Sequence, residues 1–241
     1  MLSQQENRRK VKEAIGDLLA VSEKSIYVII DGDRTIIPTD STKVFFEYLS
    51  LDFNHIKNIF KQHGYSFNAF HDVAMYYSRI EKEKYQLACT ESANHAEIYP
   101  EFLLFMEAIK RKVQLILVTS GIAENWKNII KKYSLDYVNL IGGSYLPDDK
   151  FIVDKQAKGI IAKTIRNANK KVFAFGDTMI DFEMLKEADN SYLVVNERLN
   201  KDFIPFANKI SQLKQISFSN YFHPDIPISS LKEVQLQILG L

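Results

Sequence analysis

Two aspartates stand one residue apart, directly after a short apolar run near the start of the chain. In the stretch SIYVIIDGDRT, residues 25–30 are mostly β-branched or aromatic, and Asp31 and Asp33 follow with Gly32 between them. Carboxylates held this close repel each other and shift each other's affinity for protons. Such a pair is typical of a site that binds a cation or transfers protons, whereas a turn closed by Asx hydrogen bonds is the structural alternative.

Polar residues also follow two later apolar runs. Thr119, Ser120 and Gly121 end the run VQLILVTSG, and Asp177 ends the run KVFAFGD, with Asp181 four residues further on. In an open parallel sheet, ligands bind beyond the carboxyl ends of the strands. These groups are therefore predicted to converge on one site with the paired aspartates. The alternatives are a helix cap for Thr119 and Ser120, and a favourable first-turn position in a helix for Asp181.

The apolar runs that position these groups alternate with amphipathic stretches. We predict strands over residues 25–30, 113–120, 137–143, 171–177 and 191–195, with helices from residues 123 and 157. Continuous apolar strands separated by helices indicate an α/β fold, a doubly wound parallel sheet covered on both faces. The stretch GGSYLPDDKFIVD favours a β-hairpin beside that sheet, because Pro-Asp-Asp separates two short apolar runs. The later stretch VQLQIL fits a strand as well as the end of a helix.

Residues 41–98 break this alternation, because their apolar spacing is helical and they are rich in Phe and Tyr. We interpret them as an inserted helical cap whose aromatic residues form its own core or close over an apolar or planar substrate, the former being favoured. The predicted domains are an N-terminal helical extension, an α/β core in two segments, the cap, and a tail packing on the core. Their ranges are 1–24, then 25–40 with 99–215, then 41–98, then 216–241.

Composition excludes several classes of protein. The chain has 31 Lys and Arg against 30 Asp and Glu, without the basic excess of proteins that bind nucleic acid or membrane surfaces. Its apolar runs are too short for a membrane span, and residues 1–24 lack the apolar segment of a secretory signal. The single cysteine, Cys89, excludes an intrachain disulfide and favours a reducing cytoplasm. We expect a cytoplasmic protein that binds neither nucleic acid nor membranes; its oligomeric state stays open.

These residues together resemble the four motifs of the haloacid dehalogenase superfamily of phosphatases and phosphotransferases. DGDRT, beginning at Asp31, is similar to the first motif, DxDx(T/V), and Thr119 is similar to the Ser/Thr of the second. Lys158 is similar to the motif lysine, with Lys155 as its rival and a solvated helix-start lysine as the structural alternative. GDTMID, residues 176–181, is similar to the GDxxxD form of the fourth motif. The helical insertion resembles the cap of the phosphoserine phosphatase-like branch.

The resemblance implies hydrolysis of a small phosphorylated metabolite through an aspartyl phosphate, with Mg²⁺ as cofactor. Asp31 is the implied nucleophile and Asp33 the acid/base that protonates the leaving oxygen and then activates water. The implied phosphate-binding residues are Thr119, Ser120, Gly121 and Lys158, the last also catalytic. Mg²⁺ prefers oxygen ligands. The implied metal residues are Asp31, Asp33 (through its backbone carbonyl), Asp177 and Asp181.

The substrate is less well determined, because the chain departs from the phosphoserine phosphatase pattern. Ile180 stands where that branch usually has Asn, and Asp40 stands where its cap has a longer glutamate. Arg79 is the nearest candidate for the arginine that binds the substrate carboxylate. We expect Asp40 and Arg79 to select the substrate rather than perform chemistry. Transfer of the phosphoryl group to another acceptor, and a catalytically silent binding module, are the alternative functions.

Overall fold

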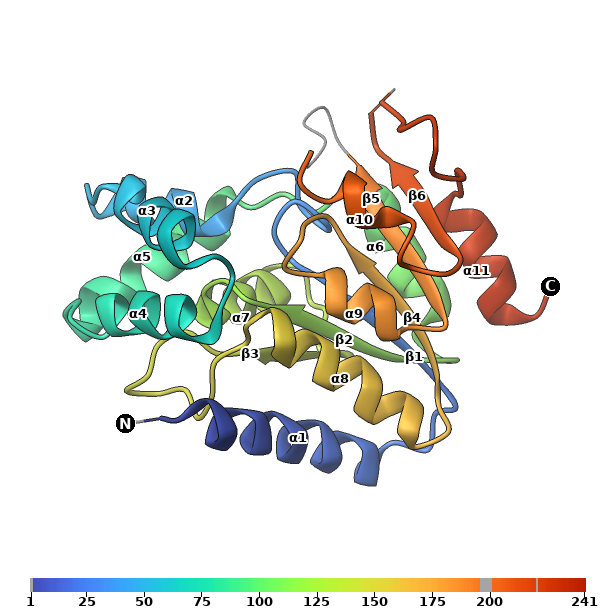
Figure 1. Ribbon diagram of the computed structural model, residues 1–241, viewed down its shortest axis with the longest axis horizontal. Helices are drawn as coiled ribbons and strands as arrows, with labels where there is room; N and C mark the ends of the chain where they lie inside the picture. Colours follow the sequence, from blue (N-terminus) through green and yellow to red (C-terminus); the bar gives the residue numbers. More distant parts are fainter. Residues whose placement is uncertain (1, 196–200, 220) are drawn as a thin grey trace.

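The computed structural model describes residues 2–195, 201–219 and 221–241. Within these residues, six strands form one parallel sheet in the order β3-β2-β1-β4-β5-β6 (Figure 1). The strands are β1 (Ile26–Ile30), β2 (Gln114–Thr119), β3 (Val138–Gly142), β4 (Lys171–Gly176), β5 (Asn190–Val195) and β6 (Leu213–Ser217). The predicted doubly wound α/β fold is confirmed. The five predicted strands are within one residue of their observed bounds, whereas β6 was not predicted.

Strand β1 lies at the centre of the sheet, where the order of the strands reverses. Ile30, its last residue, pairs with Leu117 of β2 on one side and with Phe175 of β4 on the other. Strands β2 and β3 lie on one side of β1, and β4, β5 and β6 lie on the other. The connections to the two sides therefore diverge, which leaves a crevice beyond the carboxyl ends of β1, β2 and β4. The aspartates that follow β1 are therefore placed at the position where open α/β sheets bind ligands.

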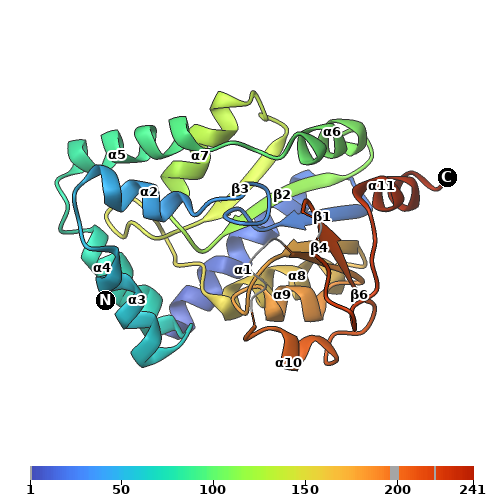
Figure 2. The ribbon, with the colours of Figure 1, turned by 90° about the horizontal axis from the view of Figure 1, so that it is seen from above.

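Helices cover both faces of the sheet because successive strand residues point to opposite sides (Figure 2). On one face, Val28 and Ile30 belong to a buried cluster that includes residues of α6 (Pro100–Ile109), α7 (Ala123–Lys132) and α11 (Leu231–Leu239). In β1, β2, β4 and β5 every residue except the first is buried, which explains why these strands read as continuous apolar runs.

On the other face, Tyr27 and Ile29 join a second buried cluster. It includes residues of α1 (Gln4–Val21), α8 (Lys155–Asn167) and α9 (Phe182–Glu187). Helix α1 packs along α8, so the predicted N-terminal extension covers the core through α8 (Figure 1). The short helix α10 (Ile204–Ala207) follows β5 in the chain.

Residues 41–98, all of which the structure describes, form helices without any strand. These helices are α2 (Ser41–Tyr48), α3 (Phe53–His63), α4 (Phe67–Tyr77) and α5 (Lys82–His95). Phe45, Phe46 and Tyr85 are buried in their common core, and the rings of Phe45 and Tyr85 lie 5.2 Å apart, edge to face. These aromatic residues therefore form the core of the cap. The division of the chain at residues 40 and 99 remains a prediction.

The β-hairpin expected over residues 142–154 is wrong: after β3 ends at Gly142, residues 143–154 contain no strand. The carboxylate of Asp149 accepts hydrogen bonds from the backbone N–H groups of Ser144 and Tyr145, at 2.6 and 2.7 Å. These two N–H groups are bonded to a side chain and not to a second strand, so the segment is a loop.

The ambiguous stretch VQLQIL lies in α11, near the end of the chain. A capping box opens this helix, because Ser230 and Glu233 each bond to the other's backbone N–H group. Gly240, in the left-handed conformation at φ 76°, ends it. Val234 and Ile238 of α11 are buried against the sheet, so the stretch is a helix.

Candidate active site

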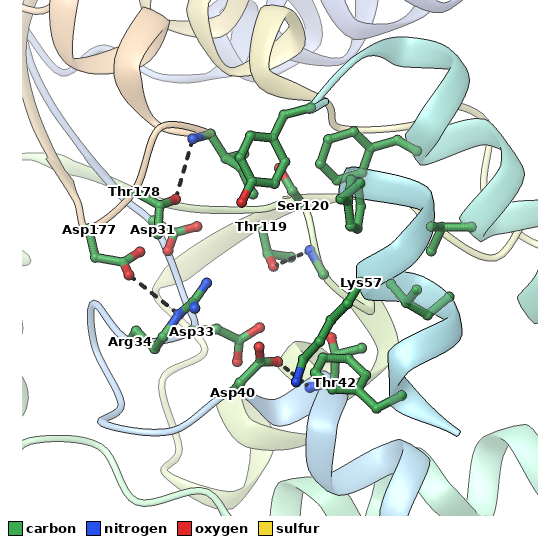
Figure 3. A pocket seen from close by; sticks show the side chains of 18 of the residues that line it. Asp31, Asp33, Arg34, Asp40, Thr42, Lys57, Thr119, Ser120, Asp177 and Thr178 are labelled. Carbon is green, nitrogen blue, oxygen red and sulfur yellow. Dashed lines mark hydrogen bonds and ion pairs between the residues drawn. The ribbon is translucent and has the colours of Figure 1, made fainter. Parts of the chain in front are cut away.

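The carboxyl ends of β1, β2 and β4 and the cap helices α2, α3 and α4 enclose a cavity of about 470 Å³ (Figure 3). Of the residues predicted to form the site, only Asp181 and Arg79 are absent from its lining. Those that line it are Asp31, Asp33, Asp40, Thr119, Ser120, Gly121, Lys158 and Asp177. Residues separated by up to 146 positions in the chain thus line one cavity, among them the groups that follow β1, β2 and β4.

Lys158 connects two of the predicted aspartates. Its amino group donates hydrogen bonds to Asp31 Oδ1 and to Asp181 Oδ1, the latter at 2.7 Å, and its side chain is 1% exposed. Burial alone would lower the pKa of Lys158, but the two carboxylates more than compensate and raise it. Lys158 is therefore a fully charged lysine held against Asp31. Lys155, the rival, lies over the ring of Phe182 instead.

Asp181 holds the lysine and the preceding turn at the same time. Its second carboxylate oxygen, Oδ2, accepts hydrogen bonds from the backbone N–H groups of Asp177 and Thr178 and from the Thr178 hydroxyl, at 3.0–3.2 Å. A Cβ atom at Gly176 would come within 2.4 Å of the Asp181 Cβ atom, so only glycine permits this approach. Asp181 is fully buried and both of its oxygens are engaged.

The two paired aspartates are held in different ways. Asp31 Oδ2 accepts a hydrogen bond from the Thr35 hydroxyl at 3.2 Å, while its other oxygen faces Lys158. Asp33 Oδ1 accepts from the backbone N–H group of Ser41 at 2.8 Å. Burial, together with Asp181, raises the pKa of Asp31 to about 6. Burial, together with Asp40, raises the pKa of Asp33 to about 7.

The turn after β2 presents groups that suit an anion. The backbone N–H group of Gly121 donates to Thr119 Oγ1 at 3.0 Å. The Ser120 hydroxyl is buried and has no hydrogen-bond partner among the described residues, so it can form a hydrogen bond with a ligand. A Cβ atom at Gly121 would lie 2.9 Å from Asp33 Oδ2, which explains the glycine at this point.

Arg34 lies inside the DGDRT motif, at a position from which the sequence leaves its side chain to face either the substrate phosphate or solvent. Its Nε atom forms an ion pair with Asp177 Oδ2 at 3.4 Å (Figure 3). Two lysines of cap helix α3, Lys57 and Lys61, also line the cavity. Nothing in the sequence distinguishes these two from solvated helix lysines, whereas the position of Arg34 inside the first motif was a usable signal.

Three buried acidic residues form a group that fits a metal ion. Asp31, Asp177 and Asp181 each offer a carboxylate oxygen, and these oxygens lie within 4.8 Å of one another. Burial is the largest influence on Asp177 and, with the neighbouring carboxylates of Asp181 and Asp31, raises its pKa well above the ordinary value, although the charge of Arg34 acts in the opposite direction. Several carboxylate oxygens close to one another suit a hard divalent cation such as Mg²⁺.

The two predicted substrate residues differ in position. Asp40 lines the cavity and is the N-cap of α2, where its side chain accepts hydrogen bonds from the backbone N–H groups of Thr42 and Lys43. Arg79 is exposed and is not among the described residues that line the cavity. The structure therefore brings Asp40, but not Arg79, to the other site residues.

The family model for haloacid dehalogenase-like hydrolases matches residues 28–186, well over half of the 241-residue chain. The chain belongs to this family. In the hydrolase, Asp31 and Asp177 directly follow β1 and β4, and Thr119 is the last residue of β2. No match to the hydrolase was found among curated proteins.

Solved structures show how widely the fold of the hydrolase is shared. A phosphoserine phosphatase with a phospho-aspartyl intermediate analogue is 18% identical, with a TM-score of 0.55, covering 88% of this chain and 98% of its own. A haloacid dehalogenase family hydrolase from Salmonella enterica is 18% identical, with a TM-score of 0.59, covering 90% of this chain and 77% of its own. A cytosolic 5'-nucleotidase IIIB bound to cytidine is 8% identical, with a TM-score of 0.55, covering 100% and 92%. At these identities the likeness shows a common fold.

In the part of the chain that the structure describes, no helix is both long and apolar enough to cross a bilayer.

Proposed function

We propose that the hydrolase is a Mg²⁺-dependent phosphatase, which cleaves a small phosphate monoester through an aspartyl phosphate on Asp31. The observation that carries this proposal is the placement of Asp31 at the carboxyl end of β1, with Lys158 bound to one of its oxygens and Asp33 in the same cavity. A carboxylate nucleophile, a fixed cation and a second carboxyl group are what two-step phosphoryl transfer requires. The phosphoserine phosphatase structures of the same fold support it.

In the first step, an oxygen of Asp31 attacks phosphorus and the bond to the ester oxygen breaks. Asp33 donates its proton to that leaving oxygen, so the alcohol departs neutral. In the second step, Asp33 takes a proton from water, whose oxygen attacks the aspartyl phosphate and releases inorganic phosphate and Asp31. Splitting the reaction in this way replaces one difficult displacement with two easier ones.

Groups around the phosphoryl site offset its negative charge. Lys158 supplies a fixed positive charge, and the hydroxyl groups of Thr119 and Ser120 supply hydrogen-bond donors. Because the Ser120 hydroxyl is buried without a partner, a phosphate oxygen would satisfy it. The proposed contacts of the phosphate are therefore Lys158, Thr119 and Ser120, and Gly121 lines the cavity in the same turn.

The metal would be held by Asp31, Asp177 and the backbone carbonyl of Asp33. Asp181 also belongs to the acidic group, but both of its oxygens already accept hydrogen bonds, so we assign it to holding Lys158 and the turn after β4. Bound there, Mg²⁺ would neutralise phosphate charge that would otherwise repel the Asp31 carboxylate.

The direct test of this function is release of inorganic phosphate from a generic aryl phosphate, measured with Mg²⁺ and with a chelator. We expect hydrolysis that depends on Mg²⁺. Absence of hydrolysis from a broad panel of phosphorylated metabolites, in the presence of Mg²⁺, would contradict the proposal. A panel with added alcohols separates hydrolysis from phosphoryl transfer, because transfer yields a new ester in place of phosphate.

Replacing Asp177 by Asn should weaken Mg²⁺ binding while leaving the fold intact. The amide is nearly isosteric but has no charge, so the Mg²⁺ concentration for half-maximal activity should rise by roughly 10- to 100-fold. Activity at low Mg²⁺ should collapse and recover in part at high Mg²⁺. Asp148→Asn is the matched control, since Asp148 pairs with Lys82 at an exposed position outside the cavity. Wild-type metal dependence in Asp177→Asn would show that Asp177 is not a ligand.

Asp40 should select among substrates rather than perform chemistry. Asp40→Asn retains an N-cap for α2 but removes the charge, whereas Asp40→Ala also loses the cap and about 1 kcal/mol of stability. Both variants should change relative kcat/KM among metabolites more than turnover of a small generic ester. Arg79→Ala tests the second predicted contact, and we expect little change because Arg79 is exposed outside the cavity. Equal losses on every substrate would refute a selecting role for Asp40.

A further inference from the structure

Arg34 has an unusual backbone for a residue with a side chain. Its φ angle is 63°, in the left-handed region that glycine adopts without cost. Its backbone N–H group donates to the carbonyl of Thr39 at 3.1 Å, which closes the loop after β1 in this conformation. Since the backbone would accept glycine more readily, the side chain of Arg34 is the feature that needs an explanation.

That side chain contacts a proposed metal ligand. Arg34 Nε lies 3.4 Å from Asp177 Oδ2, and the Asp177 side chain is only 9% exposed. Arg34 Nε is buried and has no hydrogen bond of good geometry with any described residue. The contact therefore supplies attraction between opposite charges and does little to orient the carboxylate.

The distribution of charge in the cavity makes this contact important. Lys158 is already bound to Asp31 and Asp181. Among the described residues, Asp177 forms an ion pair with Arg34 alone. Lys57 and Lys61 line the same cavity but form no ion pair with any described residue. Without a metal, Arg34 is thus the cation that compensates the Asp177 carboxylate.

We propose that Arg34 is a built-in counter-ion of the metal site, which neutralises Asp177 until Mg²⁺ takes that carboxylate and then binds the phosphate of the substrate. A guanidinium ion and Mg²⁺ attract the same carboxylate but repel each other, so binding the metal must weaken the ion pair. The released guanidinium lines the cavity with Lys158 and Thr119, and its planar set of donors suits phosphate oxygens. This inference rests on the proposed function, because it takes Asp177 to be a Mg²⁺ ligand.

Titration calorimetry with Mg²⁺ alone tests the first half. Arg34→Gln and Arg34→Gly should both bind Mg²⁺ about tenfold more tightly than the wild type, since the metal no longer displaces a cation. Arg34→Gly keeps the test valid if the glutamine variant folds poorly, because glycine suits φ 63°. Lys61→Gln is the matched control: it removes the same charge from the same cavity without touching Asp177, and its Mg²⁺ affinity should stay close to the wild type. Unchanged or weaker Mg²⁺ binding in both Arg34 variants overturns the inference.

Thermal unfolding gives a second readout that does not depend on activity. Without Mg²⁺, the Arg34 variants leave the buried Asp177 carboxylate without its cation, whereas saturating Mg²⁺ compensates it in every variant. The rise in Tm on adding Mg²⁺ should therefore be larger in Arg34→Gln and Arg34→Gly than in the wild type. An equal rise in all three proteins overturns the inference. Each protein is compared with itself, with and without Mg²⁺. Any stability that Arg34→Gly gains from a less strained backbone is then present in both measurements and cancels.

Inorganic phosphate, titrated in saturating Mg²⁺, tests the second half. The Arg34 variants should bind phosphate about tenfold more weakly than the wild type, so metal and phosphate affinities change in opposite directions. Unchanged phosphate affinity overturns the assignment of Arg34 to the phosphate. Failure of the proposed function gives a different result, because the wild type itself would then neither bind Mg²⁺ nor hydrolyse esters. If the wild type binds Mg²⁺ and hydrolyses esters, and the Arg34 variants bind Mg²⁺ and phosphate with wild-type affinity, this inference is refuted and the proposed function stands.

Discussion

Asp31→Asn should abolish turnover of every phosphate ester, whatever its leaving group. An amide oxygen is too weak a nucleophile to form the phosphorylated enzyme. The other carboxylate bound to Lys158, that of Asp181, has both oxygens engaged and does not line the cavity. The variant should still fold, because Asn can turn its oxygen toward Lys158 and its amide toward the Thr35 hydroxyl. Steady-state phosphate release measures the loss.

The control for Asp31→Asn is the thermal unfolding midpoint, which should stay near that of the wild type and exclude global unfolding. A burst of leaving group or residual turnover above the limit set by contaminating phosphatases would contradict the role of Asp31. Such a result would point to attack by water or by another side chain.

Asp33→Asn should slow hydrolysis of ordinary alkyl phosphates by about 10²- to 10⁴-fold, the usual contribution of general acid–base catalysis. The side-chain carbonyl of Asn can still accept the hydrogen bond from the Ser41 N–H group, so the loop should keep its shape. The variant lacks the proton that the leaving oxygen needs and the base that water needs. The loss should therefore depend on the leaving group.

An ester with a good leaving group separates the two duties of Asp33. A nitrophenyl anion departs without a proton, so Asp33→Asn should still be phosphorylated by nitrophenyl phosphate. Dephosphorylation should remain slow because no base activates water. Stopped-flow absorbance should show a burst of nitrophenolate followed by a slow steady state. An equal loss for alkyl and nitrophenyl esters, without a burst, would contradict the assignment of Asp33 as acid and base.

The sequence predicted most of the fold because its strands are buried on both faces. The stretch Tyr27–Ile30 has no exposed position, so its apolar run is continuous and easily read. Strand β6 escaped prediction because it lies at the edge of the sheet and includes the exposed Lys214. The supposed hairpin failed because the carboxylate of Asp149 binds the backbone of its own loop, which strand-pattern reasoning does not represent.

The candidate site was predictable in its residues but not in its contacts. Strand ends and motif spacing located Asp31, Asp33 and Asp177, because position along a parallel strand determines position in space. The engagement of both Asp181 oxygens and the pairing of Arg34 with Asp177 depend on side-chain conformations. The failure of Arg79 to reach the cavity depends on how the cap helices pack. Spacing along the chain fixes none of these.

Peptide mapping of phosphorylated Asp33→Asn, quenched in acid during the nitrophenyl phosphate burst, tests the central claim most directly. The account predicts one added phosphoryl group per chain, on Asp31, and none in Asp31→Asn treated in the same way. Acid quenching preserves an acyl phosphate long enough for mass spectrometry, and hydroxylamine should remove the label. A label on Thr119 or Ser120, or a burst with no phosphorylated enzyme, would contradict the aspartyl-phosphate mechanism.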